Sequence, residues 1–193
     1  MYPPTQTAAP ATTPVTMPEA RAQCQIESDD TSFDTLVQLY LDAATAHLDG
    51  YSGILGRCIV TQSWKQEFDD FSKCLRLPMP AASITSITYL EDDGVTAPTV
   101  TPTNYALHHD ALGSYVRFID DFSAPSGLWE TKAVAVTFTA GYGAAAAVPA
   151  AIKAAVLLLL THWFQNRAAV GEGVAELPMG VSALIAPYRR VGV

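Results

Sequence analysis

The chain has 193 residues, of which 49% are hydrophobic, enough for a buried core in one domain or in one domain that carries an inserted second one. A formal net charge of −8 excludes a protein that grips nucleic acid through clustered Lys and Arg side chains. The charge is uneven: residues 1–63 hold seven acids and two bases, residues 64–132 ten and five, and residues 133–193 two and four. An acidic body with a basic C-terminal part suits docking between unlike surfaces.

The cysteines and the apolar runs limit which classes of protein the chain can belong to. Cys24, Cys58 and Cys74 lack metal-ligand spacing and predict free, reduced thiols in a protein made in the cytoplasm. No basic segment followed by an apolar run stands at the N-terminus, so the sequence predicts no signal peptide. The most apolar run, residues 154–160, is too short to span a bilayer and predicts the core-facing part of a helix.

The first third of the chain predicts an arm followed by two helices. Residues 1–16 are uncharged and rich in Pro, Thr and Ala, which predicts a flexible arm that either stays disordered or orders against a neighbour. Pro18 opens a short helix that stops near Ile26. After a polar linker, a longer helix over about 32–50 is predicted by apolar residues at three- and four-residue spacing, namely Phe33, Leu36, Val37, Tyr40, Ala44, Leu48 and Tyr51, with Gly50 and Gly53 ending it.

The middle of the chain predicts an antiparallel sheet folded on itself. Polar and apolar residues alternate from Arg57 to Phe68, which indicates a strand. The Asp93-Gly94 step is a hairpin signal. Further short strands are expected at 75–77, 84–90, 95–100, 104–109, 114–119 and 132–139. About seven short strands are typical of a small sandwich or barrel.

Helices return at the C-terminal end. Pro149 suits the first turn of a helix that runs to about Ala169, with an apolar stripe of Ile152, Val156, Leu159, Leu160 and Trp163. A last short helix is expected at 181–186. The predicted fold class is therefore α+β, a bundle of the N- and C-terminal helices with an inserted antiparallel β sandwich or barrel-like domain. The expected parts are an arm (1–16), a helical core (17–56 and 145–187), a β domain (57–144) and a tail (188–193).

No motif in the sequence predicts catalysis. Residues 108–110, His-His-Asp, invite a metal site, but adjacent strand residues point to opposite faces and no third ligand has suitable spacing. The acidic pairs at 69–70, 92–93 and 120–121 fall at predicted turns, where Asp is favoured for backbone hydrogen bonds. Residues 141–143, Gly-Tyr-Gly, lack the Lys of a phosphate loop. We therefore expect no catalytic residue, no metal and no cofactor.

Four segments carry motifs in a fixed order. Residues 17–64 run through a short helix, an acidic break, a long helix, a Tyr-x-Gly turn and a strand ending Thr-Gln-x-Trp. Residues 75–80 form a Leu-x-Leu-Pro-x-Pro step before a strand and an acidic turn. Residues 138–167 join Phe-x-Ala-Gly-Tyr-Gly and Val-Pro-x-Ala-Ile-Lys to a helix ending His-Trp-Phe-x-Asn-Arg, and residues 176–190 read ELPMGVSALIAPYRR. Together they resemble the head–tail connector (adaptor) proteins of long-tailed double-stranded DNA bacteriophages and prophages.

The resemblance implies a structural subunit of the virion neck, assembled in the host bacterial cytoplasm. Such subunits form a dodecameric ring of identical copies under the portal protein, extend the channel through which double-stranded DNA passes without tight binding, and dock a stopper or tail-terminator protein. The resemblance implies portal contact for Tyr188, Arg189, Arg190 and Val191. It implies an inter-subunit or channel-facing helix surface for Lys153, His162, Gln165 and Arg167. The β domain would lie at the ring periphery or contact tail components, and no membrane partner is expected.

Two other interpretations stay open. The first is another neck protein, a stopper or tail-completion protein, which differs from an adaptor in the neighbour that it binds. The second is a small β-domain enzyme or a carbohydrate-binding module, which would need a concave site with convergent polar groups.

Overall fold

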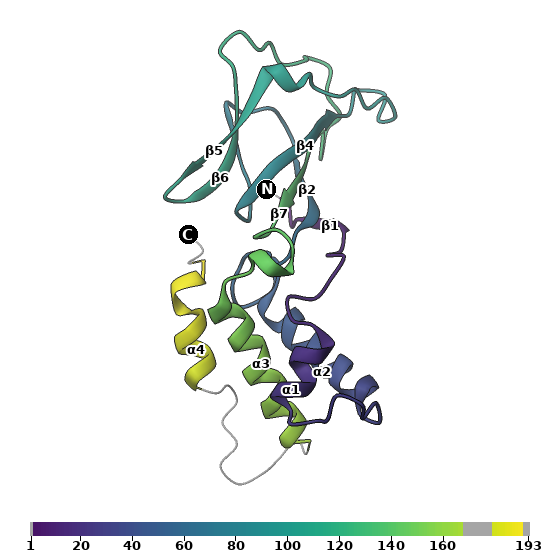
Figure 1. The fold of residues 1–193 in the computed structure, drawn as a ribbon. Coiled ribbons are helices and arrows are strands. Elements are labelled where there is room, and N and C mark those ends of the chain that lie inside the picture. Colours follow the sequence, from purple (N-terminus) through teal and green to yellow (C-terminus); the bar gives the residue numbers. More distant parts are fainter. Residues whose placement is uncertain (1, 168–178, 191–193) are drawn as a thin grey trace. The chain divides into compact units, whose positions relative to one another are not determined.

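The computed structural model describes residues 2–167 and 179–190 and has the mixed α+β fold that the sequence predicts (Figure 1). The chain divides into two compact units. The first, called the β unit, contains the residues up to Ala11 and residues 61–141, and it holds two antiparallel sheets. The second, called the helical unit, contains residues 12–60 and the described residues from Tyr142 onward.

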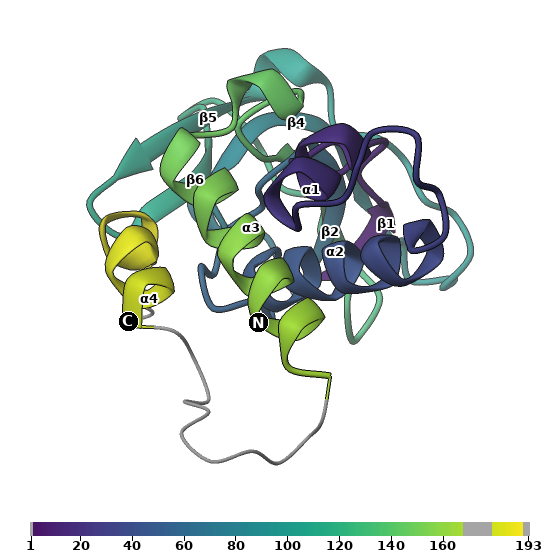
Figure 2. The same ribbon diagram turned by 60° about the horizontal axis from the view of Figure 1, so that its bottom comes forward.

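The helical unit joins helices from both ends of the sequence, so the predicted contact between N- and C-terminal helices is confirmed. Its helices are α1 (Met17–Gln23), α2 (Asp34–Leu48), α3 (Ala150–Gln165) and α4 (Met179–Ile185). α3 contacts both α2 and α4, and the turned view shows it between them (Figure 2). Within the described residues, no helix combines the length and the apolar character needed to cross a membrane.

The core of the helical unit follows the predicted apolar stripes with local changes. On α3 the buried residues are Ile152, Ala155, Val156, Leu159 and Leu160. On α2 they are Val37, Leu41, Ala44 and Leu48, while the predicted core residues Phe33 and Tyr51 stay partly exposed. Leu41 is buried although the predicted stripe contains its neighbour Tyr40, which is only partly buried against this core.

A capping box fixes the start of α1. The backbone N–H of Thr16 donates to the Glu19 carboxylate (2.7 Å), and the Thr16 side chain accepts from the Glu19 backbone N–H (3.4 Å). These bonds satisfy backbone groups that a helix start leaves without partners. The pKa of Glu19 is lowered because its carboxylate accepts from the Thr16 backbone N–H and from the Thr16 hydroxyl (2.8 Å). Just before the cap, Val15 is fully buried in the helical core.

We expect Thr16→Ala to destabilise the helical unit by about 1 kcal/mol, because it removes the side-chain half of the capping box. Urea unfolding followed by circular dichroism at 222 nm measures the change. Thr12→Ala, at an exposed position outside the cap, is the matched control. Equal midpoints for the two variants would show that the cap contributes nothing measurable.

A glycine turn ends α2, as the sequence predicts. Gly50 has a φ of +78°, and its backbone N–H donates to the Arg57 carbonyl (3.0 Å). A Cβ at Gly53 would lie 2.2 Å from the Asp49 carbonyl oxygen, so no side chain fits there. The turn also brings the Asp49 carboxylate to the backbone N–H of Ile59 (2.6 Å). The chain therefore leaves α2 along a fixed path.

The β unit contains two antiparallel sheets. One has the strand order β1-β2-β7-β4, formed by Thr5–Ala8, Gln62–Phe68, Val134–Ala140 and Ala81–Tyr89. The other has the order β3-β6-β5, formed by Cys74–Arg76, Gly113–Phe118 and Tyr105–Asp110. Short 3₁₀ turns lie at Pro102–Asn104 in this unit, and at Ala145–Ala147 and Ala186–Tyr188 in the helical unit.

Strand β7 is the centre of the larger sheet. It pairs with β2 on one side and β4 on the other, with Phe138 opposite Trp64 and Ile84. Its buried residues alternate as Val134, Val136, Phe138 and Ala140, which confirms the alternation read from the sequence.

The N-terminal segment differs from the predicted flexible arm. Residues 5–8 form strand β1, which pairs antiparallel with β2 in the register Thr5↔Lys65 and Gln6↔Trp64. Composition predicts a flexible arm because the segment is rich in Pro, Thr and Ala and has few large apolar residues to bury. An edge strand is held by backbone hydrogen bonds to its neighbour and needs no core of its own.

Two predicted strands differ from the structure. Residues 57–61 are not part of β2, because Ile59 and Val60 are buried in the core of the helical unit. Residues 95–100 form no strand; only Thr99 makes an isolated bridge to Thr88. Pro98 has no backbone N–H to donate, which prevents a continuous ladder there.

Candidate interaction surfaces

The C-terminal end of the described chain is anchored to the helical unit. Tyr188 packs against the helical core, and the backbone N–H of Arg190 donates to the Leu55 carbonyl (2.9 Å). Arg189 lies between them with an exposed side chain, and within the described residues that side chain has no hydrogen bond or ion pair. Val191 lies outside the described residues. Of the four residues expected at the portal, Arg189 is therefore the one that most clearly offers its side chain to a partner.

The four residues expected on the polar face of α3 do not form one surface. Lys153 is half-buried in the first turn of the helix, within electrostatic reach of Glu19 on α1. His162 and Gln165 lie in the last turn, where Gln165 is exposed. Asn166 closes the helix, since its amide donates to the His162 carbonyl (2.9 Å). The structure thus separates Lys153 from the others by the length of α3.

Arg167 packs on aromatic rings of its own chain. Its guanidinium carbon lies 4.8 Å from the ring centre of Phe164 and 5.6 Å from that of Phe33. The two rings meet edge to face at 5.9 Å. This cation–π arrangement connects the end of α3 with the start of α2 and explains why Phe33 stays near the surface.

A second arginine interaction was not predicted. The guanidinium of Arg57 donates to the Tyr142 hydroxyl (2.8 Å), and the backbone N–H of Tyr142 donates to the Ile59 carbonyl (3.0 Å). These bonds join the segment after α2 to the segment before α3. The Gly-Tyr-Gly motif, interpreted from the sequence as a plain turn, therefore holds a specific side-chain contact. Only the presence of Tyr between two glycines hinted at it.

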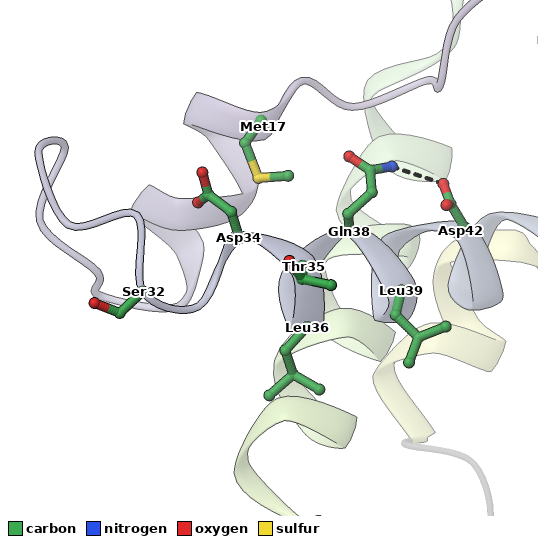
Figure 3. Close-up of a pocket in the computed structure, with 8 residues that line it drawn as sticks. All are labelled: Met17, Ser32, Asp34, Thr35, Leu36, Gln38, Leu39 and Asp42. Atoms are coloured by element: carbon green, nitrogen blue, oxygen red, sulfur yellow. Dashed lines mark hydrogen bonds between the residues drawn. The ribbon is translucent and has the colours of Figure 1, made fainter.

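A shallow groove runs along the outer face of α2 (Figure 3). Its apolar lining includes Met17, Leu36 and Leu39, and Leu39 is 61% exposed. Asp42 lies at its edge and accepts a hydrogen bond from Gln38 (2.7 Å). The remaining lining residues are Ser32, Asp34 and Thr35. An apolar strip beside carboxylates suits contact with another protein and offers no convergent polar groups for a small molecule.

The histidine pair does not form a metal site. His109 hydrogen-bonds to the Ser114 hydroxyl (2.9 Å), whereas His108 stacks on the ring of Tyr115 at 5.5 Å. The neighbouring Asp110 accepts two hydrogen bonds from the Arg76 guanidinium, at 3.0 and 2.6 Å. Within the described residues, no three His, Cys, Asp or Glu side chains are grouped to hold a metal ion.

Arg76 controls the charge of Asp110. Its hydrogen bonds lower the pKa of Asp110 from 3.8 to about 2. This interaction stabilises the fold above pH 3.8 and is lost as the pH falls towards 2.

We expect Arg76→Gln to raise the pKa of Asp110 towards 3.8, measured by NMR from the carboxyl carbon shift against pH. Lys73→Gln is the control, because Lys73 pairs with Asp120. An unchanged Asp110 titration in Arg76→Gln would contradict this assignment.

The acidic pairs lie at turns and bends, as the sequence predicts. Asp93 accepts the backbone N–H groups of Val95 (2.8 Å) and Thr96 (2.7 Å). Together with the Thr96 hydroxyl, these bonds lower the pKa of Asp93. Asp69 accepts the Tyr2 hydroxyl (2.6 Å), so this acid also binds the N-terminal segment.

Solved structures with the same fold come from gene transfer agent (GTA) particles. A chain in the "neck of empty GTA particle computed with C6 symmetry" has a TM-score of 0.80 and 23% sequence identity, covering 100% of this chain and 97% of that one. A chain in the "virion of native gene transfer agent (GTA) particle" has a TM-score of 0.77 and 23% identity, with 98% and 96% covered. A third, in the "neck of native GTA particle computed with C12 symmetry", has a TM-score of 0.67 and 23% identity, with 98% and 97% covered. No family model and no curated protein matches the sequence.

Proposed function

We propose that this chain is a structural head–tail connector (adaptor) subunit in the neck of a tailed-phage-like particle. The observation that carries the proposal is the shared fold over the whole chain with chains of GTA particles, two of them in neck structures. The four motifs that resemble connector proteins support the same role independently. The proposed role is structural and needs no catalytic site; Asp110, Asp93 and His109 serve an ion pair, a turn and a side-chain hydrogen bond.

In this proposal, identical copies form a twelve-membered ring under the portal protein. The helical unit is the connector core, and the β unit faces the ring periphery or the tail components. The net charge of −8 suits a channel wall, because DNA must pass without being held by its phosphates. The end of the chain, Tyr188 to Val191, contacts the portal, and the anchored Arg189 presents the charge for that contact.

The alternative is a stopper role. It is considered because the two similar neck structures were computed with different symmetries, C6 and C12. Both roles place the chain in the neck. They differ in copy number and in the neighbour that the chain binds.

Quantitative mass spectrometry of density-purified particles tests the proposal. A ratio of one copy per portal subunit is expected for an adaptor ring. A ratio near one half favours a six-fold neck component, and absence from the particle overturns the neck function altogether.

A further inference from the structure

We propose that strand β1 is exchangeable between copies, so that the β2 edge of one chain accepts residues 2–8 of a neighbouring chain. The role of this exchange in linking ring neighbours rests on the proposed function. The exchange itself rests on how the N-terminal segment is bound.

The N-terminal segment contributes almost nothing to the core of the β unit. All four residues of β1, Thr5 to Ala8, are exposed, and the segment carries no charged side chain. Removing it from its own chain therefore costs little apolar burial. The edge of β2 would then present unpaired backbone groups, which accept any strand of suitable sequence.

The surface that receives the segment is specific. Gln66 is fully buried in β2, and its side-chain amide donates to the Tyr2 carbonyl (2.7 Å). Gln62, 3% exposed, accepts a hydrogen bond from the side chain of Gln6. Gln66 also donates to the Glu67 carbonyl (3.0 Å), and Gln62 also accepts from the Trp64 indole (3.2 Å). The N-terminal segment therefore adds one hydrogen bond to each of these buried side chains and covers the edge of β2.

The side chain of Tyr2 adds a second point of recognition. Its hydroxyl donates to the Asp69 carboxylate (2.6 Å), and the Lys132 ammonium nitrogen lies 5.2 Å from its ring centre. The β2 edge thus binds the segment by backbone pairing, by the contacts of Gln62 and Gln66, and by the contacts of the Tyr2 side chain. These contacts select this sequence over an arbitrary strand.

The connection to α1 makes exchange inexpensive. Five residues, Ala9 to Thr13, join β1 to the buried Pro14 and Val15 and reach at most about 17 Å. A strand from a second copy makes the same contacts as the strand of the same chain, so the two arrangements differ only in the path of this short connection. Short connections of this kind favour swapping. In a ring, the neighbour's strand is also present at high effective concentration.

Introduced cysteines test the exchange in the full chain, with Cys24 and Cys74 replaced by Ser and the buried Cys58 retained. Thr5 and Lys65 are register partners across β1 and β2. Copies with Thr5→Cys and copies with Lys65→Cys, carrying different tags, are co-expressed and oxidised. We expect a disulfide-linked dimer with both tags. The control pairs Thr5→Cys with Ser83→Cys, since Ser83 is exposed on β4 at the opposite edge of the sheet.

The outcomes separate the exchange from the proposed function. If the double variant Thr5→Cys/Lys65→Cys closes its disulfide within one chain and the mixed copies give no two-tag dimer, the exchange is overturned. Native mass spectrometry of the same sample reports assembly. A ring without two-tag dimers overturns the exchange alone, while two-tag dimers without any ring support the exchange and count against the ring.

Discussion

Replacing Arg189 with glutamate is expected to lower the number of copies of this chain per particle at least tenfold. Arg189 is exposed at the anchored end of the helical unit, in the basic part of an acidic chain. In the proposed neck, this end contacts the portal. Reversing its charge replaces an attraction with a repulsion at that contact, and a tenfold loss corresponds to about 1.4 kcal/mol of binding free energy.

Lys73→Glu is the matched control for this prediction. It changes the net charge by the same amount on an exposed side chain of the β unit, where Lys73 pairs with Asp120 at 3.1 Å. Copies per particle are counted by mass spectrometry relative to the portal protein. Both variants should unfold at the temperature of the original chain, because neither residue is buried. Equal numbers of copies per particle for Arg189→Glu and Lys73→Glu would show that the C-terminal end does not make the portal contact.

The regular parts of the fold could be predicted because burial leaves a periodic trace in the sequence. In β7, hydrophobic residues at every second position from Val134 to Phe138 predict a strand, and all of them are buried. In α3, Ile152, Val156 and Leu159 lie at helical spacing, and all three are buried. Such patterns fix the type of element because each one repeats the period of its backbone.

The missed features depend on contacts between residues distant in sequence. Arg57 and Tyr142 meet only because the turn after α2 and the segment before α3 are folded together. Strand β1 has no pattern of its own, since its structure depends on β2 as a template. Ile59 and Val60 continue a strand-like alternation, yet they pack in the helical core. In each case, the structure of the segment depends on the distant part of the chain that it contacts and not on its local sequence.

The candidate surfaces also include features that the sequence predicts and features that it does not. The basic charge of the C-terminal part follows from the sequence, whereas the exposure of the Arg189 side chain is seen only in the structure. The groove on α2 does not, because Leu39 falls within a helix whose apolar spacing predicted only one buried face. The contact of Arg167 with the rings of Phe33 and Phe164 does not follow from the sequence either, and the expected position of Arg167 at a neighbour or the channel stays a prediction.

Phe138→Ala is expected to destabilise the β unit by about 3–5 kcal/mol. Phe138 is fully buried in the central strand β7, opposite Trp64 on β2 and Ile84 on β4. Its removal loses apolar burial and leaves a cavity in the core against the buried face of the sheet. Urea unfolding of the purified chain, followed by tryptophan fluorescence and by circular dichroism, measures the loss.

Thr139→Ala, one position along the same strand, shows what the cavity itself contributes. Thr139 is half-buried and shares a hydrogen bond with Ser83 (2.8 Å), so its loss should cost about 1 kcal/mol. The threefold or greater difference between neighbouring residues follows from the alternation of β7, which points Phe138 into the core and Thr139 away from it. If both variants unfold at the same urea concentration, β7 is not the centre of the sheet's stability. Trp64 and Trp129 lie in the β unit and Trp163 lies on α3, so a fluorescence transition of Phe138→Ala that comes below the circular dichroism transition of the helices indicates that the β unit unfolds first.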